Sequence, residues 1–340
     1  MIIKDFEHIQ TAHCENGVTS SLLSYHGLKE ISEPLAFGIG AGLFYIQIPL
    51  LKVNGGPAIS FRTMPGNIFK QTVKSLGIDV VRKKFNDHKA AQRFLDQQIE
   101  KGNPVGAQVG VYQLPYFPVE YRFHFNAHNI IIFGKEGDQY LVSDPVMETT
   151  TSLSAAELEK VRFAKGPLAP KGQIYFPENV REIDQDTLKK AIKRGIKRNV
   201  RDMLMIPGNV AGVRGIHYTA KKVRKWRDKL GERKGGLYLG QIVRMQEEIG
   251  TGGGGFRFIY AAFLQEAAQI FGNEELARIA EDFSTAGDMW RDSAVNMAQV
   301  YRGRNTSQAQ FNLCADQMDA IAVLEKKAFE QLKKTQKHLG

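Results

Sequence analysis

The chain has 340 residues, of which 43% are hydrophobic and 24% charged, a composition typical of globular proteins. No apolar run is long enough to cross a bilayer, and the first residues lack the basic, apolar and small-residue regions of a signal peptide. Cys14 and Cys314 cannot form a disulfide framework, so the expected compartment is a reducing cytoplasm. A chain of this length predicts two domains.

The net charge of +10 resides in one segment of the chain. Residues 189–234 contain 16 lysines and arginines but only three acidic residues, whereas the remainder has 30 basic and 33 acidic residues. Such a segment is either a solvated helix face or a docking surface, which an acidic protein would suit. Nucleic acid is the weaker alternative, because no zinc-finger spacing, aromatic RNA-binding motif or heptad zipper accompanies the charge.

The first 180 residues mix helical and strand patterns. A helix is predicted to begin at Cys14 and to end before Gly27, and a glycine-rich turn at 37–42 precedes a strand. Residues 112–121, which contain two prolines and several aromatic residues, are predicted to form a loop over the site. Further helices are expected at 65–76, 87–101 and 155–163, and strands at 44–48, 80–85, 104–111, 128–133, 139–143 and 173–176.

From about residue 180 the pattern changes to long helices, at 186–206, 213–230, 237–249, 256–271, 274–301 and 307–339. The predicted fold class is therefore α+β, followed by an all-α domain, with the boundary near 177–184. We expect the first domain at 1–180 to carry the site. The all-helical domain at 181–340 would serve as a lid or bind a partner or substrate.

Cys14, His128 and Asp144 are the strongest candidates for a catalytic site. A thiol attacks a carbonyl carbon as the thiolate, and Cys14 begins a predicted helix whose free N–H groups favour negative charge. His128 begins one strand and Asp144 ends the next, and a turn at 135–138 places position 130 opposite position 144. The two side chains are then diagonal neighbours, so the acid can orient an imidazole that activates the thiol. This chain order suits a papain-like thiol site.

Each of the three residues also has a purely structural interpretation. A lone cysteine on an amphipathic helix is usually a core residue, a histidine can be a satisfied polar group at a strand end, and an Asp-Pro step marks turns. Their combination in this order favours catalysis. The backbone N–H of Cys14 is a natural oxyanion donor, and Gln10 or Asn16 is expected to supply the second.

The glycine run at 250–255 matches the spacing of a dinucleotide-binding motif, but a helix rather than a strand precedes it. We interpret the run as an interhelical turn. The alternative is an anion site in which Gly252, Gly253 and Arg257 bind a substrate or carrier phosphate. No cluster of His, Cys and acidic residues has metal-ligand spacing, so no metal is predicted.

Two stretches of the sequence resemble a known family. The His-Cys pair at 13–14 and the Ser-Glu-Pro-Leu-Ala-Phe-Gly-Ile-Gly-Ala-Gly-Leu stretch at 32–43 resemble the N-terminal domain of butirosin biosynthesis protein H. Residues 249–257 and 260–267 resemble the helical domain of unknown function that often follows it. Together the two domains cover nearly the whole chain.

The resemblance implies a papain-like cysteine fold used for synthesis. The butirosin protein moves an aminoacyl group from an acyl carrier protein to an aminoglycoside amine, which implies that Cys14 is the nucleophile, His128 the base and Asp144 the orienting acid. It also implies an acidic acyl carrier protein docking on residues 189–234, with its phosphopantetheine arm as co-substrate and no bound cofactor. The related bacteriocin-processing peptidases place an oxyanion glutamine six residues before the cysteine, whereas Gln10 lies four before it.

The predicted function is therefore acyl transfer from a carrier thioester, through an acyl-cysteine intermediate, to a small amine in secondary metabolite biosynthesis. A cysteine peptidase or amidase that uses the same triad, with water as the acceptor, is the runner-up. A non-catalytic basic scaffold or nucleic-acid binder is the third interpretation.

Overall fold

The structure, a computed structural model, describes residues 1–53 and 55–339. It divides the chain into an N-terminal unit, Met1–Ala36 with Pro65–Thr187, and a C-terminal unit, Phe37–Met64 with Leu188–Gly340. The second boundary lies close to the expected 177–184. Residues 37–64, however, were expected in the first domain at 1–180 and belong instead to the C-terminal unit.

The reason lies in the partners of that segment. Strands β1 (Leu43–Val53) and β2 (Gly56–Arg62) pair only with each other among the described strands. The Tyr45 hydroxyl donates to the Thr219 hydroxyl over 2.7 Å, and the Phe37 ring stacks on Phe256 at 5.4 Å. These partners come from distant parts of the sequence, so local patterns could not assign the segment.

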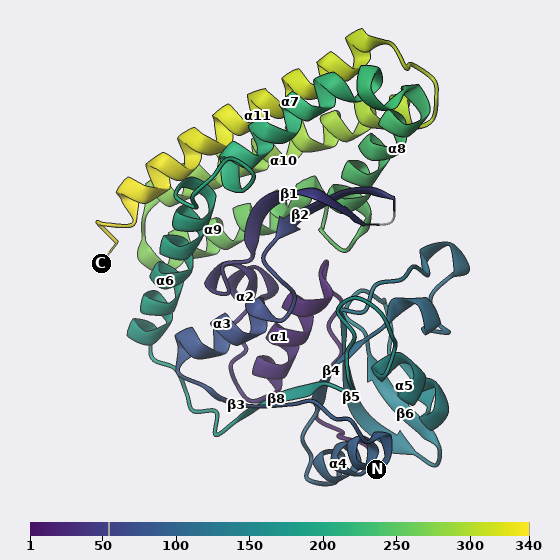
Figure 1. Cartoon of the computed structure of the whole chain (residues 1–340). Coiled ribbons are helices and arrows are strands. Elements are labelled where there is room, and N and C mark those ends of the chain that lie inside the picture. The colour runs from purple at the N-terminus through teal and green to yellow at the C-terminus, as the bar shows by residue number, and fades with distance from the viewer. Residues whose placement is uncertain (54, 340) are drawn as a thin grey trace. The chain divides into compact units, whose positions relative to one another are not determined.

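The N-terminal unit is built on a six-stranded antiparallel sheet with the order β3-β8-β4-β5-β6-β7 (Figure 1). The strands are β3 (Asp79–Lys83), β4 (Val105–Val109), β5 (His128–Glu136), β6 (Gln139–Ser143), β7 (Thr151–Ser154) and β8 (Ile174–Glu178). The helices are α1 (Cys14–Tyr25), α2 (Glu33–Ile39), α3 (Asn67–Leu76), α4 (His88–Glu100) and α5 (Ala155–Arg162). The unit boundary falls within α2.

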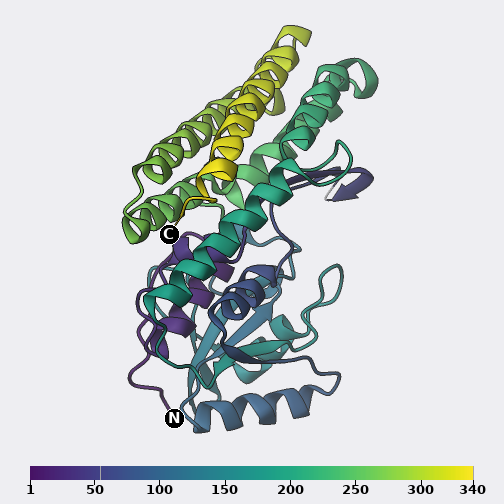
Figure 2. The same cartoon turned by 90° about the vertical axis from the view of Figure 1, so that its left-hand side faces the viewer.

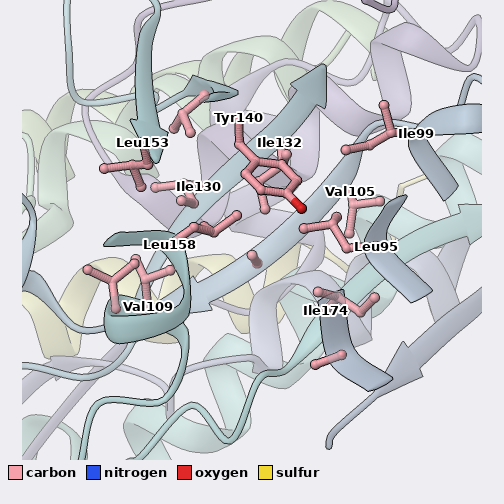
Figure 3. Packing of buried hydrophobic residues seen from close by; sticks show 14 of the residues in the cluster. Leu95, Ile99, Val105, Val109, Ile130, Ile132, Tyr140, Leu153, Leu158 and Ile174 are labelled. Atoms are coloured by element: carbon pink, nitrogen blue, oxygen red, sulfur yellow. The ribbon is translucent and has the colours of Figure 1, made fainter. Parts of the chain in front are cut away.

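One face of this sheet is covered by α4 and α5. Figure 3 shows the apolar cluster between these helices and the sheet. It includes Leu95 of α4, Leu158 of α5, and Ile130 and Ile132 of β5. Helix α1 contacts β4, β5 and β8. Because successive side chains of a strand point to opposite faces, position 129 of β5 faces away from the cluster that holds 130 and 132.

A β-bulge in β5 sets the register of the β5–β6 hairpin. On the turn side Gly134 pairs with Leu141, but on the far side Ile132 pairs with Val142, so Phe133 is an extra residue on β5. An extra residue of this kind shifts the pairing by one position and increases the local twist.

This bulge decides where the site residues point. The pair Ile131–Ser143 continues to position 130 opposite position 144, which is the register expected from the sequence. His128, two residues before position 130, then shares a face with Asp144. Without the bulge the pairing would slip by one residue, and His128 would point to the opposite face of the sheet.

The C-terminal unit consists of helices around the β1–β2 hairpin. Helix α11 (Gln308–Thr335) packs against α7 (Gly212–Leu230) and α10 (Glu274–Tyr301), and the three run side by side (Figure 1 and Figure 2). Helix α10 also contacts α8 (Glu232–Val243) and α9 (Arg257–Phe271). The remaining helical elements are α6 (Gln185–Leu204), a π-helical turn (Arg244–Glu248) and a 3-10 turn (Gly254–Phe256).

The predicted class is confirmed: the N-terminal region combines helices with a sheet, and residues 185–339 contain helices and no strand. Three elements were not predicted, namely α2, β2 and β7, and each is short and lies in a polar or glycine-containing segment. Across the described residues no helix combines the length and apolarity needed to span a membrane.

Candidate active site

Cys14 is the first residue of α1, as predicted, and its side chain is buried with 6% of the residue exposed. His13 precedes the helix in an extended conformation, and its ring accepts a hydrogen bond from the N–H of Asn16 over 3.4 Å. This cap defines where the helix begins. The thiol therefore lies at the end of α1 where the backbone dipoles favour negative charge.

His128 and Asp144 form a buried pair. Nε2 of His128 donates to Oδ2 of Asp144 over 2.6 Å, and Asp144 is fully buried. Asp144 also accepts hydrogen bonds from the Tyr116 hydroxyl at 2.9 Å and from the N–H of Val146 at 3.2 Å. The carboxylate is thus held by three donors and fixes the orientation of the imidazole.

The electrostatics of His128 favour the imidazolium. Burial alone would lower the pKa of this side chain, but the charges of Asp144 and Cys14, with the hydrogen bonds to both, raise the pKa to about 10. Because Nε2 is bonded to Asp144, Nδ1 is the ring nitrogen left for the thiol. At neutral pH His128 is therefore an imidazolium, which is the partner of the nucleophilic sulfur in many cysteine enzymes.

The loop at 112–121 contributes two aromatic rings to the site. It contains two 3-10 turns (Val111–Gln113 and Val119–Tyr121), and between them the Phe117 ring centroid lies 5.5 Å from that of His128. Burial, followed by the charge of Asp144, raises the pKa of Tyr116 well above its ordinary value. Tyr116 therefore stays protonated and remains a hydrogen-bond donor to Asp144.

Two carboxylates, that of the fully buried Glu15 and that of the half-buried Glu33, anchor the start of α1. Glu15, which follows Cys14, is fully buried and accepts hydrogen bonds from the first N–H groups of α3, with the N–H of Ile68 at 2.9 Å. Glu33 accepts from the N–H groups of Ala12 at 3.0 Å and His13 at 2.8 Å. Burial raises the pKa of Glu33, although these hydrogen bonds act in the opposite direction. Each carboxylate replaces lost hydration with fixed N–H donors.

The two expected oxyanion residues do not contact the sulfur in the part of the chain that the structure describes. Gln10 is exposed in the segment before α1, and the Asn16 side chain lies beside Glu33. Instead, Nδ2 of Asn129 lies 3.8 Å from Sγ of Cys14. Asn129 was not among the predicted site residues, and its position directly after His128 is the one signal for it in the sequence.

At the glycine run, where an anion site was one of two predictions, Arg257 and two backbone N–H groups have partners within the chain. Arg257 is fully buried and its guanidinium donates to both carboxylate oxygens of Glu325, at 2.8 and 2.9 Å. The N–H of Gly253 donates to the Thr251 hydroxyl at 3.0 Å, and the N–H of Gly254 donates to the Glu247 carboxylate at 3.1 Å.

The run is thus a turn in which the Arg257 guanidinium and the N–H groups of Gly253 and Gly254 already have partners within the chain. Gly252 is exposed. A phosphate would have to compete with Glu325 and Glu247 for these groups. The interpretation as an interhelical turn fits this arrangement.

Other histidines have acidic partners but lie outside the thiol site. His88 contacts Glu159 at 2.7 Å, and His217 contacts Asp319 at 2.6 Å, both on partly exposed surfaces. Among the residues that the structure describes, no group of three or more His, Cys, Asp and Glu side chains could hold a metal ion.

Comparison with known proteins gives two family matches. The family model for butirosin biosynthesis protein H, N-terminal, matches residues 13–145, a range that begins one residue before Cys14 and ends one after Asp144. The model for a domain of unknown function (DUF4872) matches residues 156–332. The comparison with curated proteins found no match.

Among solved structures, the chain is similar to a protein described as a C39-like peptidase from Bacillus anthracis. The identity is 14%, the match covers 54% of this chain and 98% of that chain, and the TM-score is 0.38. The two family matches follow one another along the sequence and account for most of it. The chain therefore belongs to the family in which a butirosin biosynthesis protein H N-terminal domain is followed by the DUF4872 domain.

Proposed function

We propose that the protein is a cysteine-dependent acyltransferase that moves an acyl group from a carrier-bound thioester to an amine. The observation that carries this proposal is the arrangement of one imidazole between a buried carboxylate and a thiol at a helix start. Helix α1 packed on a sheet that holds the histidine is also what a papain-like fold would provide. Family membership supports synthesis in preference to hydrolysis.

The first half-reaction would transfer the acyl group to the enzyme. The thiolate of Cys14 attacks the thioester carbonyl, a new carbon–sulfur bond forms, and the bond to the carrier sulfur breaks. The departing carrier thiolate takes the proton of the His128 imidazolium and leaves as a thiol. His128 is then neutral, and Asp144 holds it in the tautomer whose Nδ1 can accept a proton.

The second half-reaction would form the amide. An acceptor amine attacks the carbonyl of acyl-Cys14 and gives a proton to His128, and the tetrahedral intermediate collapses with loss of the Cys14 thiolate. The thiolate–imidazolium pair is thereby restored. Exclusion of water matters at this stage, because water in place of the amine would make the enzyme a hydrolase.

The donor would be an acidic acyl carrier protein presenting its phosphopantetheine arm, in a cytoplasmic biosynthetic pathway. Support for such a partner comes from α7, which lies in the basic segment. Lys221, Lys225 and Lys229 are exposed at a spacing of four residues, so they share one face of the helix. No acidic side chain pairs with these three in the described part of the chain.

Other basic residues of α7 are engaged within the unit. Arg224 contacts Asp316 at 2.5 Å and Asp319 at 2.8 Å, on α11, and Arg227 contacts Glu232 at 2.6 Å. The helix thus separates a paired basic face from an unpaired one. The unpaired face would attract an acidic protein and accelerate its encounter with the enzyme.

The test is intact-protein mass spectrometry after incubation with a panel of acyl-loaded carrier proteins. Wild-type protein should gain the mass of the acyl group, while Cys14→Ala should gain nothing. Adding a series of small amines should then remove the acyl group from the enzyme as an amide.

The same experiment separates transfer from hydrolysis. Release of the free acid at the same rate with and without amines would identify a peptidase or amidase that uses the same residues. An absence of adduct from every donor, together with a thiol that resists mild alkylation, would contradict the proposal.

A further inference from the structure

We infer that Asn129 is the side-chain donor of the oxyanion hole, a role that rests on the proposed acyl transfer through Cys14. Its Nδ2 lies 3.8 Å from the Cys14 sulfur, and both groups are buried. Asn129 lies on β5 directly after His128, on the opposite face of the strand, so one strand brings a base and an amide to the thiol from two directions.

The orientation of the Asn129 amide is fixed by its neighbours. Nδ2 also donates to the carbonyl oxygen of Ala127 over 3.1 Å, and Oδ1 accepts from the Tyr175 hydroxyl over 2.7 Å. If the amide were flipped, its oxygen would face the Ala127 carbonyl and lose that bond. The NH₂ group is therefore held toward the sulfur.

Tyr175 is itself held in place. It lies on β8 opposite Gly106 of β4, and a Cβ at Gly106 would come within 2.6 Å of the Tyr175 ring. On another side, the Phe69 ring centroid lies 4.5 Å from that of Tyr175. The missing side chain at Gly106 thus lets the ring lie against the sheet, where its hydroxyl reaches Asn129.

A donor near the sulfur is well placed for the oxygen that develops charge. In the tetrahedral intermediate the oxyanion is on the carbon bonded to Sγ, and effective donors lie about 2.7–3.1 Å from that oxygen. The second donor is the backbone N–H of Cys14, which has no partner among the hydrogen bonds of the described residues. Two N–H groups, one from α1 and one from β5, would then share the charge.

The test compares acylation with alkylation of the same thiol. Acylation by a small acyl thioester passes through an oxyanion, whereas alkylation by iodoacetamide at a saturated carbon does not. We expect Asn129→Ala to slow acyl-Cys14 formation by about 10²–10³-fold. Its alkylation rate should fall far less, because alkylation loses only the long 3.8 Å contact between the amide and the sulfur.

Asn129→Leu is the second variant, because it keeps a side chain of similar volume and adds no charge but removes the donated hydrogen. It should also lose acylation, which would distinguish hydrogen-bond donation from packing. Tyr175→Phe keeps the Asn129 amide but removes the hydroxyl that donates to its Oδ1, so a smaller loss in acylation is expected. Thermal unfolding of each variant shows whether it is folded.

Three results would overturn the inference. Asn129→Ala with wild-type acylation would remove any role, and equal losses in acylation and alkylation would reduce Asn129 to a positioning residue for the thiolate. A wild-type protein that no thioester acylates would overturn both this role and the proposed function. If small thioesters but not carrier proteins acylate the wild type, only the proposed donor fails, and Asn129 is still tested.

Discussion

Gly17 and Pro145 lie at a point of close approach between α1 and the segment that follows Asp144. A Cβ added to Gly17 would come within 2.6 Å of Cβ of Pro145 and 2.0 Å of the Thr11 hydroxyl oxygen. The N–H of Thr11 also donates to the carbonyl of Pro145 over 2.7 Å. The absence of a side chain at Gly17 thus allows the helix that carries the thiol to approach the segment that carries the acid.

We expect Gly17→Ala to push α1 away from this segment. Overpacking of this kind costs about 1–3 kcal/mol in the free energy of unfolding, and the displacement should slow alkylation of Cys14 because its ion pair is disturbed. Urea unfolding and the rate of iodoacetamide alkylation measure the two effects. Ser24→Ala, on the same helix but half-exposed, is the control and should change neither. Wild-type alkylation in Gly17→Ala would contradict this explanation.

Asp144→Asn should separate the orienting role of the acid from that of Tyr116. Without the buried charge, the imidazolium loses its main support and the correct tautomer is no longer enforced, so acylation should fall by roughly 10²–10⁴-fold. Tyr116→Phe removes one hydrogen bond to a charged group, which is worth about 1.5–3 kcal/mol. Single-turnover acylation by a small thioester should rank Asp144→Asn below Tyr116→Phe, and the reverse order would contradict the assigned roles.

The raised pKa of His128 predicts how stability depends on pH. The folded protein holds this proton with a pKa of about 10, above the ordinary 6.5. The resulting stabilisation is therefore complete below a pH of about 6.5 and is lost as the pH rises through about 10. The difference in the free energy of unfolding between the wild type and His128→Gln should shrink over that range.

Urea unfolding of both proteins across this pH range measures the effect. Cys14→Ala should be included, because loss of the thiol removes one of the two charges that raise the pKa of His128. The difference between wild type and His128→Gln should then be smaller in the Cys14→Ala background. A difference that does not change with pH would contradict a protonated His128.

Arg257→Met should destabilise the C-terminal unit. The change leaves the fully buried Glu325 without its cation, and breaking a buried pair in this way costs about 3–5 kcal/mol. The double variant Arg257→Met/Glu325→Leu should recover much of that loss, because no unpaired charge remains. Arg278→Met, which breaks an exposed pair with Glu275, is the control and should cost about 0–1 kcal/mol. If Arg257→Met left stability unchanged but weakened acyl-carrier binding, the anion-site interpretation would return.

The unpaired face of α7 predicts a salt-dependent encounter with the carrier. Changing Lys221, Lys225 and Lys229 together to Gln should lower the association rate at low salt and flatten its dependence on ionic strength. The matched control is Lys327, Lys333 and Lys334 changed to Gln, an equal loss of exposed charge on α11. Stopped-flow fluorescence with a labelled carrier measures the rate, and equal effects of the two triple variants would exclude a docking site on α7.

The predictable part of the site is the part that local sequence signals describe. A helix start marks Cys14, and a hairpin relates His128 to Asp144. The register that brings these two together also needs the bulge at Phe133, which the sequence did not reveal. Strand alternation, by contrast, argues that Asn129 points away from Asp144. Only the packing of α1 on that second face brings the Asn129 amide to the thiol.

The unpredicted parts depend on partners that are distant in the sequence. Glu15 resembles an acidic residue that complements the dipole of its own helix, yet it caps α3, more than fifty residues later. Arg257 resembles a free cation after a glycine turn, but its partner Glu325 lies 68 residues further along the chain. Burial of a charge cannot be inferred from spacing when the neutralising group comes from a distant helix.

Because of the bulge at Phe133, the site depends on how β5 and β6 pair as well as on which residues they carry. The bulge lies between the β5–β6 turn and the site, so the turn can vary in length while the pairing near His128 stays the same. If the turn-side register continued through β5 without the bulge, position 131 would lie opposite position 144, and the imidazole would turn to the wrong side of the strand although Cys14, His128 and Asp144 are all present. A change that suppressed the bulge without removing a residue would therefore be expected to abolish the chemistry while all three residues remained in the sequence.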